Sequence, residues 1–127
     1  MHRSRLATIV VDCLGERMDE AVGFWGKALG VLADPKDKPG QRYFHFKDKV
    51  SNLDLTLQNM QGSEPPAFHI DIETDNVEAE VKRLEALGAK KKKKVKDWWV
   101  MLSPTGHTFC VIPGQFDDFS ENCKTWD

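Results

Sequence analysis

The chain contains one pattern twice, as Glu-Ala-Val-Gly-Phe-Trp-Gly-Lys-Ala-Leu-Gly-Val at residues 20–31 and as Glu-Ala-Glu-Val-Lys-Arg-Leu-Glu-Ala-Leu-Gly-Ala at residues 78–89. Each copy has the spacing of an amphipathic helix and ends in Ala-Leu-Gly. An apolar run that meets an aspartate precedes each copy, at residues 9–12 and 68–71. A repeat of this length is a whole supersecondary unit. We therefore expect two related modules, with a functional site where they meet.

The first copy predicts a strand, a helix and two further strands. The helix is expected over Met18–Leu29, because Gly30 is suited to a left-handed C-terminal cap. Its inner face should carry Ala21, Val22, Trp25 and Leu29. The strands are expected over residues 5–12, 42–46 and 53–59, the last with its leucines Leu53, Leu55 and Leu57 on a buried face.

The second copy predicts a strand, a helix and three further strands. Phe68, Ile70 and Ile72 should share the buried face of a strand. Asp75 is expected to cap the following helix, with Glu78 completing a capping box. The inner stripe of that helix should be Val77, Val81, Leu84 and Leu87. Further strands are expected over residues 89–95, 98–102 and 107–112.

These elements predict an α+β domain of two tandem βαβββ modules. Their strands would form a cupped mixed sheet with the helices on its outer face. Aromatic residues Phe116, Phe119 and Trp126 near the end of the chain suggest a tail that docks on the domain. The expected organisation is a single domain over 1–127, with module 1 at about 5–61, a linker at 62–66, module 2 at about 67–113, and a docked tail at 114–127.

Composition narrows the class of protein. The 127 residues carry a formal net charge of −2, so no global basic field indicates nucleic acid. The first apolar run is too short for a membrane span and stops at Asp12. Cys13, Cys110 and Cys123 lack metal-type spacing and suggest free thiols in a reducing compartment. We therefore expect a cytoplasmic protein without a membrane partner.

Lys90–Lys94 is an unbroken run of five lysines that falls on an expected strand. Alternation would place lysines on both faces, which favours a solvated edge strand that resists sheet-to-sheet pairing. A rim that attracts anions and a nucleic-acid patch are the alternatives.

At this point the chain resembles the vicinal oxygen chelate superfamily, the glyoxalase/bleomycin resistance protein/dioxygenase fold, and is most similar to its glyoxalase-like branch. The resemblance covers nearly the whole chain. It rests on the order and spacing of residues 11–13, 24–30, 69–75, 79–89 and 99–111. It implies two βαβββ modules that form a cup, and a homodimer.

The resemblance also implies positions for the metal ligands of the superfamily. His69 matches the histidine at the start of the fifth strand, and Cys110 falls where the last strand carries a carboxylate. The first-strand ligand would be Asp12, and the fourth-strand ligand would lie near Gln58. A hard divalent ion prefers imidazole together with carboxylate. We therefore expect the usual metal site to be absent, with a divalent metal held by His69, Gln58 and Asp12 as the alternative.

The leading hypothesis is a glyoxalase-like protein that binds a small organic ligand in the cup, without a tightly bound cofactor. His69 is the candidate acid or base, because imidazole titrates near neutral pH. The ligand should be flat or apolar with an anionic group, given the tryptophans and lysines. The candidate ligand-binding residues are Gln58, His69, Asp71, Trp98, Trp99 and Cys110. The alternatives are a lyase, isomerase or dioxygenase of the same superfamily, and an interaction module that uses Lys90–Lys94.

Overall fold

The structure is a computed structural model, and it describes residues 1–34, 36–38, 40–60, 67–114 and 118–127. The chain divides into two compact units. Unit 1 comprises residues 1–7 and 69–127, and unit 2 comprises residues 8–68. The expected linker at 62–66 and Phe116 lie outside the described residues. The single-domain organisation stays a prediction.

The elements follow one another in the order strand, helix, strands, twice over. They are β1 (His2–Leu14), the 3-10 helix η1 (Gly15–Arg17), α1 (Met18–Leu29), β2 (Tyr43–Asp48), β3 (Leu53–Met60), β4 (Ala67–Thr74), α2 (Val77–Ala86), β5 (Lys90–Val95), β6 (Trp98–Leu102), β7 (Thr108–Pro113) and β8 (Lys124–Trp126). The eight described strands form a mixed sheet, so the α+β class is confirmed. Neither described α helix is long and apolar enough to cross a membrane.

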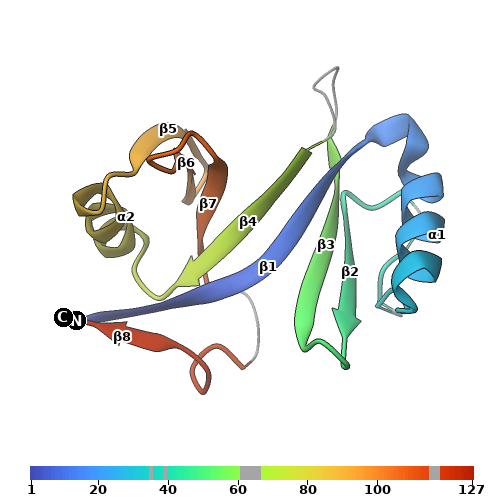
Figure 1. Ribbon diagram of the computed structural model, residues 1–127, viewed down its shortest axis with the longest axis horizontal. Helices are drawn as coiled ribbons and strands as arrows, with labels where there is room; N and C mark the ends of the chain where they lie inside the picture. Colours follow the sequence, from blue (N-terminus) through green and yellow to red (C-terminus); the bar gives the residue numbers. More distant parts are fainter. Residues whose placement is uncertain (35, 39, 61–66, 115–117) are drawn as a thin grey trace. The chain divides into compact units, whose positions relative to one another are not determined.

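In unit 2, β3 is the central strand, parallel to β1 and antiparallel to β2. Figure 1 shows α1 alongside these strands. The core between them contains Phe44, Phe46 and Leu57, of which Leu57 is fully buried. Beyond β2 and β3, an isolated bridge joins Ala33 to Phe46.

The first helix has the predicted bounds. Ala21, Val22 and Trp25 pack against the core of unit 2, as expected. Gly30 follows the helix with a φ of 67°, the left-handed conformation that glycine adopts at little cost. Leu29 was expected on the inner face, and this is wrong because its side chain is 49% exposed. Leu29 is the last residue of the helix, where the periodic pattern continues and its burial does not.

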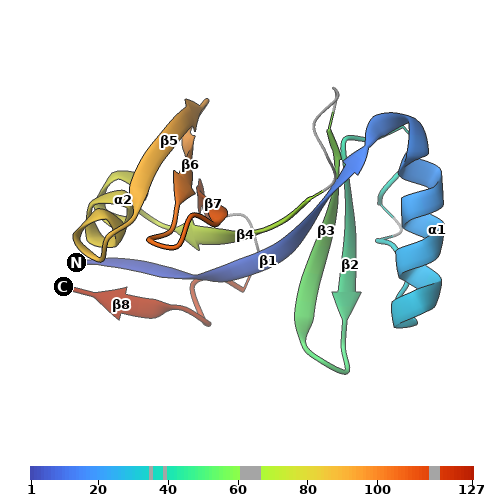
Figure 2. The same cartoon turned by 45° about the horizontal axis from the view of Figure 1, so that its top comes forward.

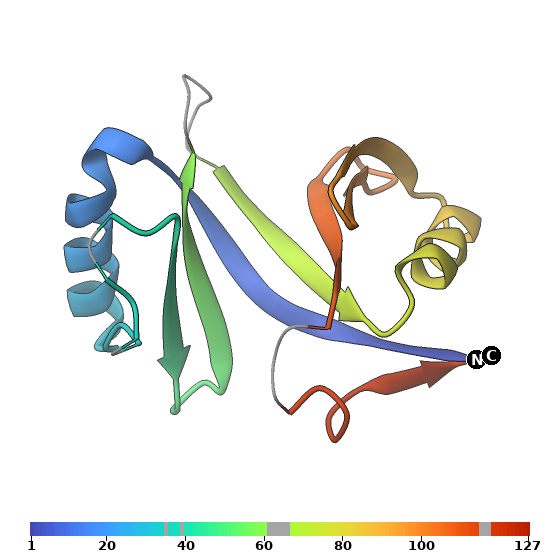
Figure 3. The same cartoon turned by 180° about the vertical axis from the view of Figure 1, so that it is seen from behind.

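In unit 1, β7 pairs with β4 in parallel and with β6 in antiparallel orientation, and β5 pairs with β6. Figure 2 shows α2 beside these strands. The buried core of unit 1 consists of Val81, Met101, Phe109 and Val111. The short strand β8 pairs in antiparallel orientation with the start of β1, which brings the two ends of the chain together (Figure 3).

The start of β1 also carries an ionic network within unit 1. His2 Nε2 lies 2.9 Å from Glu80 Oε1, and both side chains are almost fully buried. Arg5 donates from Nε to Glu73 over 2.6 Å and from an Nη to Asp118 over 2.7 Å. Charges buried in this way require partners, because desolvation alone would be costly. β1 begins at His2, earlier than the predicted start at residue 5, because His2, Arg3 and Ser4 pair with β8.

The α2 helix begins one residue later than predicted. The cap is Asn76, whose side chain accepts the Ala79 N–H over 3.0 Å. Asp75 is instead bound by Arg3, through the Arg3 backbone N–H at 2.7 Å and Nε at 2.9 Å. The predicted Asp75 cap is therefore wrong, since a long-range partner outcompetes the local one.

Several side chains predicted to be buried are open to solvent, and these predictions are wrong. They are Leu53 at 48%, Phe68 at 63%, Ile70 at 41% and Leu87 at 66% exposed. Leu53 and Phe68 lie at the start of their strands and Leu87 just beyond its helix, where the periodic pattern continues and the packing partner does not.

Candidate functional site

Three unlike reactive groups meet on one face of β4 and β7 in unit 1. Alternation along β4 places His69 and Asp71 on the same face, and the parallel register pairs Asp71 with Cys110. One donor atom from each residue lies within 4.8 Å of the others. We call these three residues the His69 cluster.

The His69 cluster is largely shielded from solvent. The His69 and Asp71 side chains are 10% and 17% exposed, and His69 Nε2 lies 3.3 Å from Asp71 Oδ1. Cys110 is buried, at 9% exposed. This distance allows an ion pair when the imidazole is protonated, and Asp71 Oδ1 accepts no hydrogen bond among the described residues. The cluster can therefore offer a donor or acceptor together with a thiol.

The opposite face of the same strands packs against the core. Ile72 pairs with the fully buried Val111, and Phe109 pairs with the fully buried Met101, in one cluster with Val81 of α2. Cross-strand partners share a face, so the His69 cluster lies on the face away from this core. Val100, the partner of Cys110 on β6, belongs to the cluster's face.

The two tryptophans of β6 point to opposite faces, as alternation requires. Trp99 pairs with the fully buried Val111 and packs against the core. Trp98 has the same parity along β6 as Val100, and so lies on the face of the His69 cluster. Of the two predicted ligand-binding tryptophans, the structure thus brings only Trp98 to the cluster's face.

The lysine run forms β5, and the ammonium groups of Lys91 and Lys94 lie 4.8 and 6.0 Å from the centre of the Trp99 ring. All five lysines are exposed, and β5 pairs only with β6 among the described strands. This arrangement is that of a solvated edge strand with lysine stems covering an indole.

Gln58 and Asp12 belong to unit 2, where they are register partners on β3 and β1. Gln58 Nε2 donates to the Tyr43 hydroxyl over 3.5 Å, and Asp12 is 9% exposed. The metal-binding alternative of His69, Gln58 and Asp12 names residues of both units and stays a prediction. Within unit 1, Asp71 and Cys110 lie close to His69.

The His69 cluster can be tested against the metals that the superfamily implies. Imidazole, carboxylate and thiolate are the donor types of zinc sites with three protein ligands. The iron site of two histidines and one carboxylate needs a second imidazole, and this cluster has only one. Among the described residues, this donor set therefore fits a zinc-like ion and does not fit a hard or ferrous ion.

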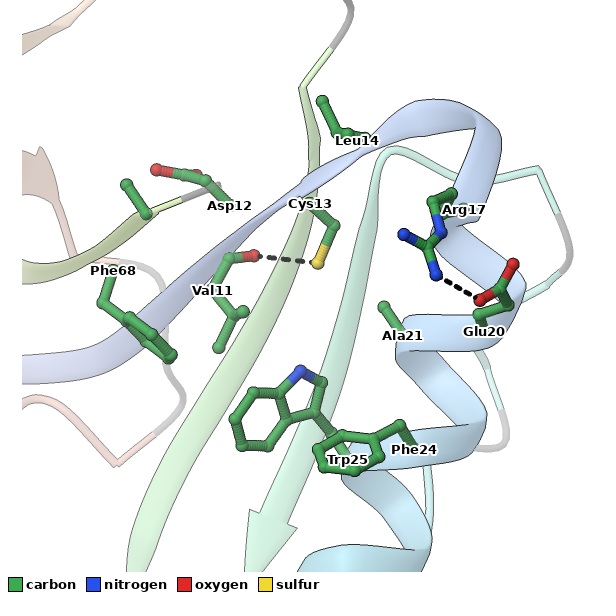
Figure 4. A pocket seen from close by; sticks show the side chains of 11 residues that line it. Val11, Asp12, Cys13, Leu14, Arg17, Glu20, Ala21, Phe24, Trp25 and Phe68 are labelled. Carbon is green, nitrogen blue, oxygen red and sulfur yellow. Dashed lines mark hydrogen bonds and ion pairs between the residues drawn. The ribbon is translucent and has the colours of Figure 1, made fainter. Parts of the chain in front are cut away.

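The sequence did not predict a pocket that lies within unit 2. It has a volume of about 460 Å³ and is lined by residues of β1, η1, α1 and the start of β4: Val11, Asp12, Cys13, Leu14, Arg17, Glu20, Ala21, Phe24, Trp25, Ala67 and Phe68. Figure 4 shows Cys13 and Val11 beside the aromatic residues of α1. The available signal was Phe24, an aromatic residue directly before Trp25 and off the predicted inner face of the helix.

The repeated strand–helix order and a polar sheet face opposite a helix-covered core define an α+β protein of the glyoxalase type. A family profile described as glyoxalase-like domain matches residues 8–112. The chain belongs to the glyoxalase-like domain family. None of the curated proteins compared with it is similar enough to count as a match.

Solved structures show the same fold at low sequence identity. A structure described as an NAD-dependent benzaldehyde dehydrogenase from Legionella pneumophila is similar with a TM-score of 0.63 at 14% identity, over 84% of this chain and 99% of that one. A glyoxalase/bleomycin resistance protein/dioxygenase superfamily member from Vibrio splendidus 12B01 has a TM-score of 0.51 at 12% identity, over 81% and 94%. An extradiol ring-cleaving dioxygenase from B. fuscum has a TM-score of 0.57 at 13% identity, over 88% of this chain and 33% of that one. At these identities the likeness establishes the fold, and the recognition of the superfamily from sequence is confirmed.

Proposed function

We propose that this glyoxalase-like protein binds a small organic molecule on the sheet face that carries the His69 cluster. The supporting observation is the gathering of His69, Asp71 and Cys110 within 4.8 Å on a shielded face opposite the core. Buried polar groups at a surface of this kind fix the orientation of a ligand. Trp98, on the same face, offers a flat apolar surface beside them.

The ligand class follows from these groups. An imidazole can donate a hydrogen bond to an anionic oxygen, and an indole favours a planar ring. We therefore propose an aromatic carboxylate as the simplest ligand type. Asp71 can form an ion pair with the His69 ring when the ring is protonated, and Cys110 provides a small, polarizable neighbour.

The test is a titration of the full chain with benzoate, followed by NMR or calorimetry. A hydrogen bond to a charged group contributes about 1.5–3 kcal/mol, so His69→Ala should weaken benzoate binding by roughly tenfold or more. His107→Ala is the matched control, because His107 is exposed and bonded to Thr105 in a turn. Equal affinity in the wild type and His69→Ala, or no binding of benzoate, would contradict the proposal.

The second candidate is a metal-dependent lyase, isomerase or dioxygenase, and the donor set of the His69 cluster favours it. A zinc-like ion bound there would act as a Lewis acid on a substrate oxygen. The chain's own contribution would be to hold the ion through His69, Asp71 and Cys110, with Cys110 as the thiolate. The test is a cobalt(II) titration, in which a thiolate ligand gives a near-ultraviolet charge-transfer band. The band should be lost in Cys110→Ser and kept in Cys123→Ser.

The oligomeric state and the cellular location stay predictions. We propose a homodimer in the cytoplasm, since the family resemblance implies a dimer and the three cysteines are free thiols. Sedimentation velocity at several protein concentrations measures the oligomeric state. The interaction-module alternative also stays a prediction, and charge reversal at Lys91 and Lys93 would test it in a binding assay.

A further inference from the structure

We propose that the pocket of unit 2 is a second ligand site, which takes a neutral aromatic molecule. We call it the α1 pocket, lined by the eleven residues given above. It shares no residue with the His69 cluster, so this inference goes beyond the proposed function.

Aromatic rings form one side of the α1 pocket. Phe24 and Trp25 of α1 are in edge-to-face contact, with ring centres 5.1 Å apart and an interplanar angle of 85°. Trp25 makes a second such contact with Phe68, at 6.0 Å and 89°. Phe24 and Phe68 are nevertheless 62% and 63% exposed. An aromatic ligand would cover rings that the chain itself leaves in water.

The floor of the α1 pocket offers no charge to a ligand. Val11 and Cys13 project from β1 toward α1, where Ala21 leaves room by its small side chain (Figure 4). Burial, and secondarily the nearby Asp12, raises the pKa of the Cys13 thiol, which keeps it neutral. Its Sγ donates to the Val11 carbonyl over 3.5 Å. Asp12 also lines the pocket, but Figure 4 shows its carboxylate pointing away from the three rings.

The rim is charged but internally compensated. Arg17 donates from an Nη to Glu20 Oε2 over 2.8 Å, which leaves the pair without net charge. A ligand carboxylate would have to compete with Glu20 for Arg17, and an amine would have to compete with Arg17 for Glu20. This favours a neutral ligand over an ionic one.

The dimensions suit a small molecule better than a second copy of the chain. A volume of about 460 Å³ lies within the range of roughly 300–1,000 Å³ that is typical of small-molecule pockets. Eleven residues line it, whereas a stable interface between proteins uses about 20–30 residues a side. A two-ring aromatic compound is of suitable size.

The experiment is a calorimetric titration of the full chain with 1-naphthol. Phe24→Ala and Phe68→Ala should each weaken binding by about tenfold, because each removes a wall of the site. Both side chains are largely exposed, so neither change should unfold the protein. Leu32→Ala and Val50→Ala are matched controls, since these residues are 88% and 97% exposed in the same unit and do not line the pocket. His69→Ala should also leave 1-naphthol binding unchanged, which separates this site from the proposed function.

Three results would overturn the inference. One is the same affinity for 1-naphthol in the wild type, Phe24→Ala and Phe68→Ala. Another is displacement of 1-naphthol by benzoate with the same affinity as 1-naphthol itself, since the site would then not select neutral molecules. The third is loss of self-association in Phe24→Ala and Phe68→Ala without any 1-naphthol binding, which would make the pocket an interface between copies.

Discussion

Unit 1 and unit 2 repeat one order of strand, helix and strands, yet different interactions hold them together. In unit 1 the strand that opens the chain is fixed by buried ionic contacts, with His2 against Glu80 and Arg5 against Glu73. In unit 2 the same strand contributes Val11 and Cys13 to an apolar core beneath α1. A repeated pattern of hydrophobic residues can thus specify a topology without specifying the interactions that stabilise it.

Removing a buried charge from unit 1 should have the largest effect on the free energy of unfolding. Glu80→Ala should lower the free energy of unfolding by about 4 kcal/mol, because removing one partner of a buried ion pair leaves the others uncompensated. Glu80 is fully buried and also accepts two hydrogen bonds from Arg83, at 2.7 and 3.0 Å. Urea denaturation measures the change. Glu85→Ala on the exposed side of the same helix should shift it by less than about 0.5 kcal/mol. A loss below 1 kcal/mol in Glu80→Ala would mean that unit 1 does not depend on this network.

Truncating a side chain in the apolar core of unit 2 should have the second largest effect on stability. Leu57→Ala should cost about 3 kcal/mol, since Leu57 is fully buried in the core of unit 2 and truncation leaves a cavity. Leu53→Ala, in the same strand but 48% exposed, should cost less than about 1 kcal/mol. Thermal unfolding monitored by circular dichroism compares the two variants. Similar losses in both would show that the core of unit 2 is not centred on Leu57.

The glycines after the two helices sharpen the comparison further. Gly30 and Gly88 both have positive φ, at 67° and 107°. An added Cβ at Gly30 would meet nothing within 4 Å, whereas one at Gly88 would lie 3.1 Å from Pro104 Cγ. Gly30→Ala should therefore cost about 1 kcal/mol from backbone strain alone, and Gly88→Ala about 2 kcal/mol. Equal costs, measured by urea denaturation, would indicate that Pro104 moves freely.

The smallest expected effect is on the way stability depends on pH. Burial alone would raise the pKa of the Glu80 carboxyl, but hydrogen bonds from Arg83, Ser4 and His2 outweigh it and lower the pKa below the usual value. Because this pKa is lower in the folded state, the stabilisation is complete above the unfolded-state value of about 4.3 and is lost as the pH falls through the folded-state value. Unfolding free energies from pH 7 to pH 3 should fall less steeply in Glu80→Gln than in the wild type. Parallel curves would remove Glu80 as the titrating group.

The sequence predicted the parts of the fold that depend on local pattern. The α1 helix has the predicted bounds, and Gly30 has the predicted conformation, because both follow from periodicity and a single residue's backbone preference. The Asp75 cap failed because Arg3, far away along the chain, binds that carboxylate. Local rules contain no information about such a partner.

The candidate site was predictable to a similar extent. Alternation along β4 put His69 and Asp71 on one face, and Cys110 required the register between β4 and β7, which the family resemblance implied. The α1 pocket was missed because Phe24 lies off the predicted inner face of its helix and Phe68 was predicted to be buried, whereas both rings are exposed and contact Trp25. Periodicity assigns each ring to a face and contains no information about the geometry between rings.

The pairing of β8 with the start of β1 has a consequence for synthesis of the protein. All residues of unit 2 are available once residue 68 has left the ribosome, whereas unit 1 needs residues 1–7 together with β8. Trp126 and Ser4, which share a hydrogen bond, are 122 positions apart. Contacts at such separation form slowly, and domains tend to fold from the N-terminal side as they emerge. His2, Arg3 and Arg5 have no side-chain partners until Glu80, Asp75 and Glu73 have been synthesised, and polar side chains tolerate exposure to water until then better than apolar ones would.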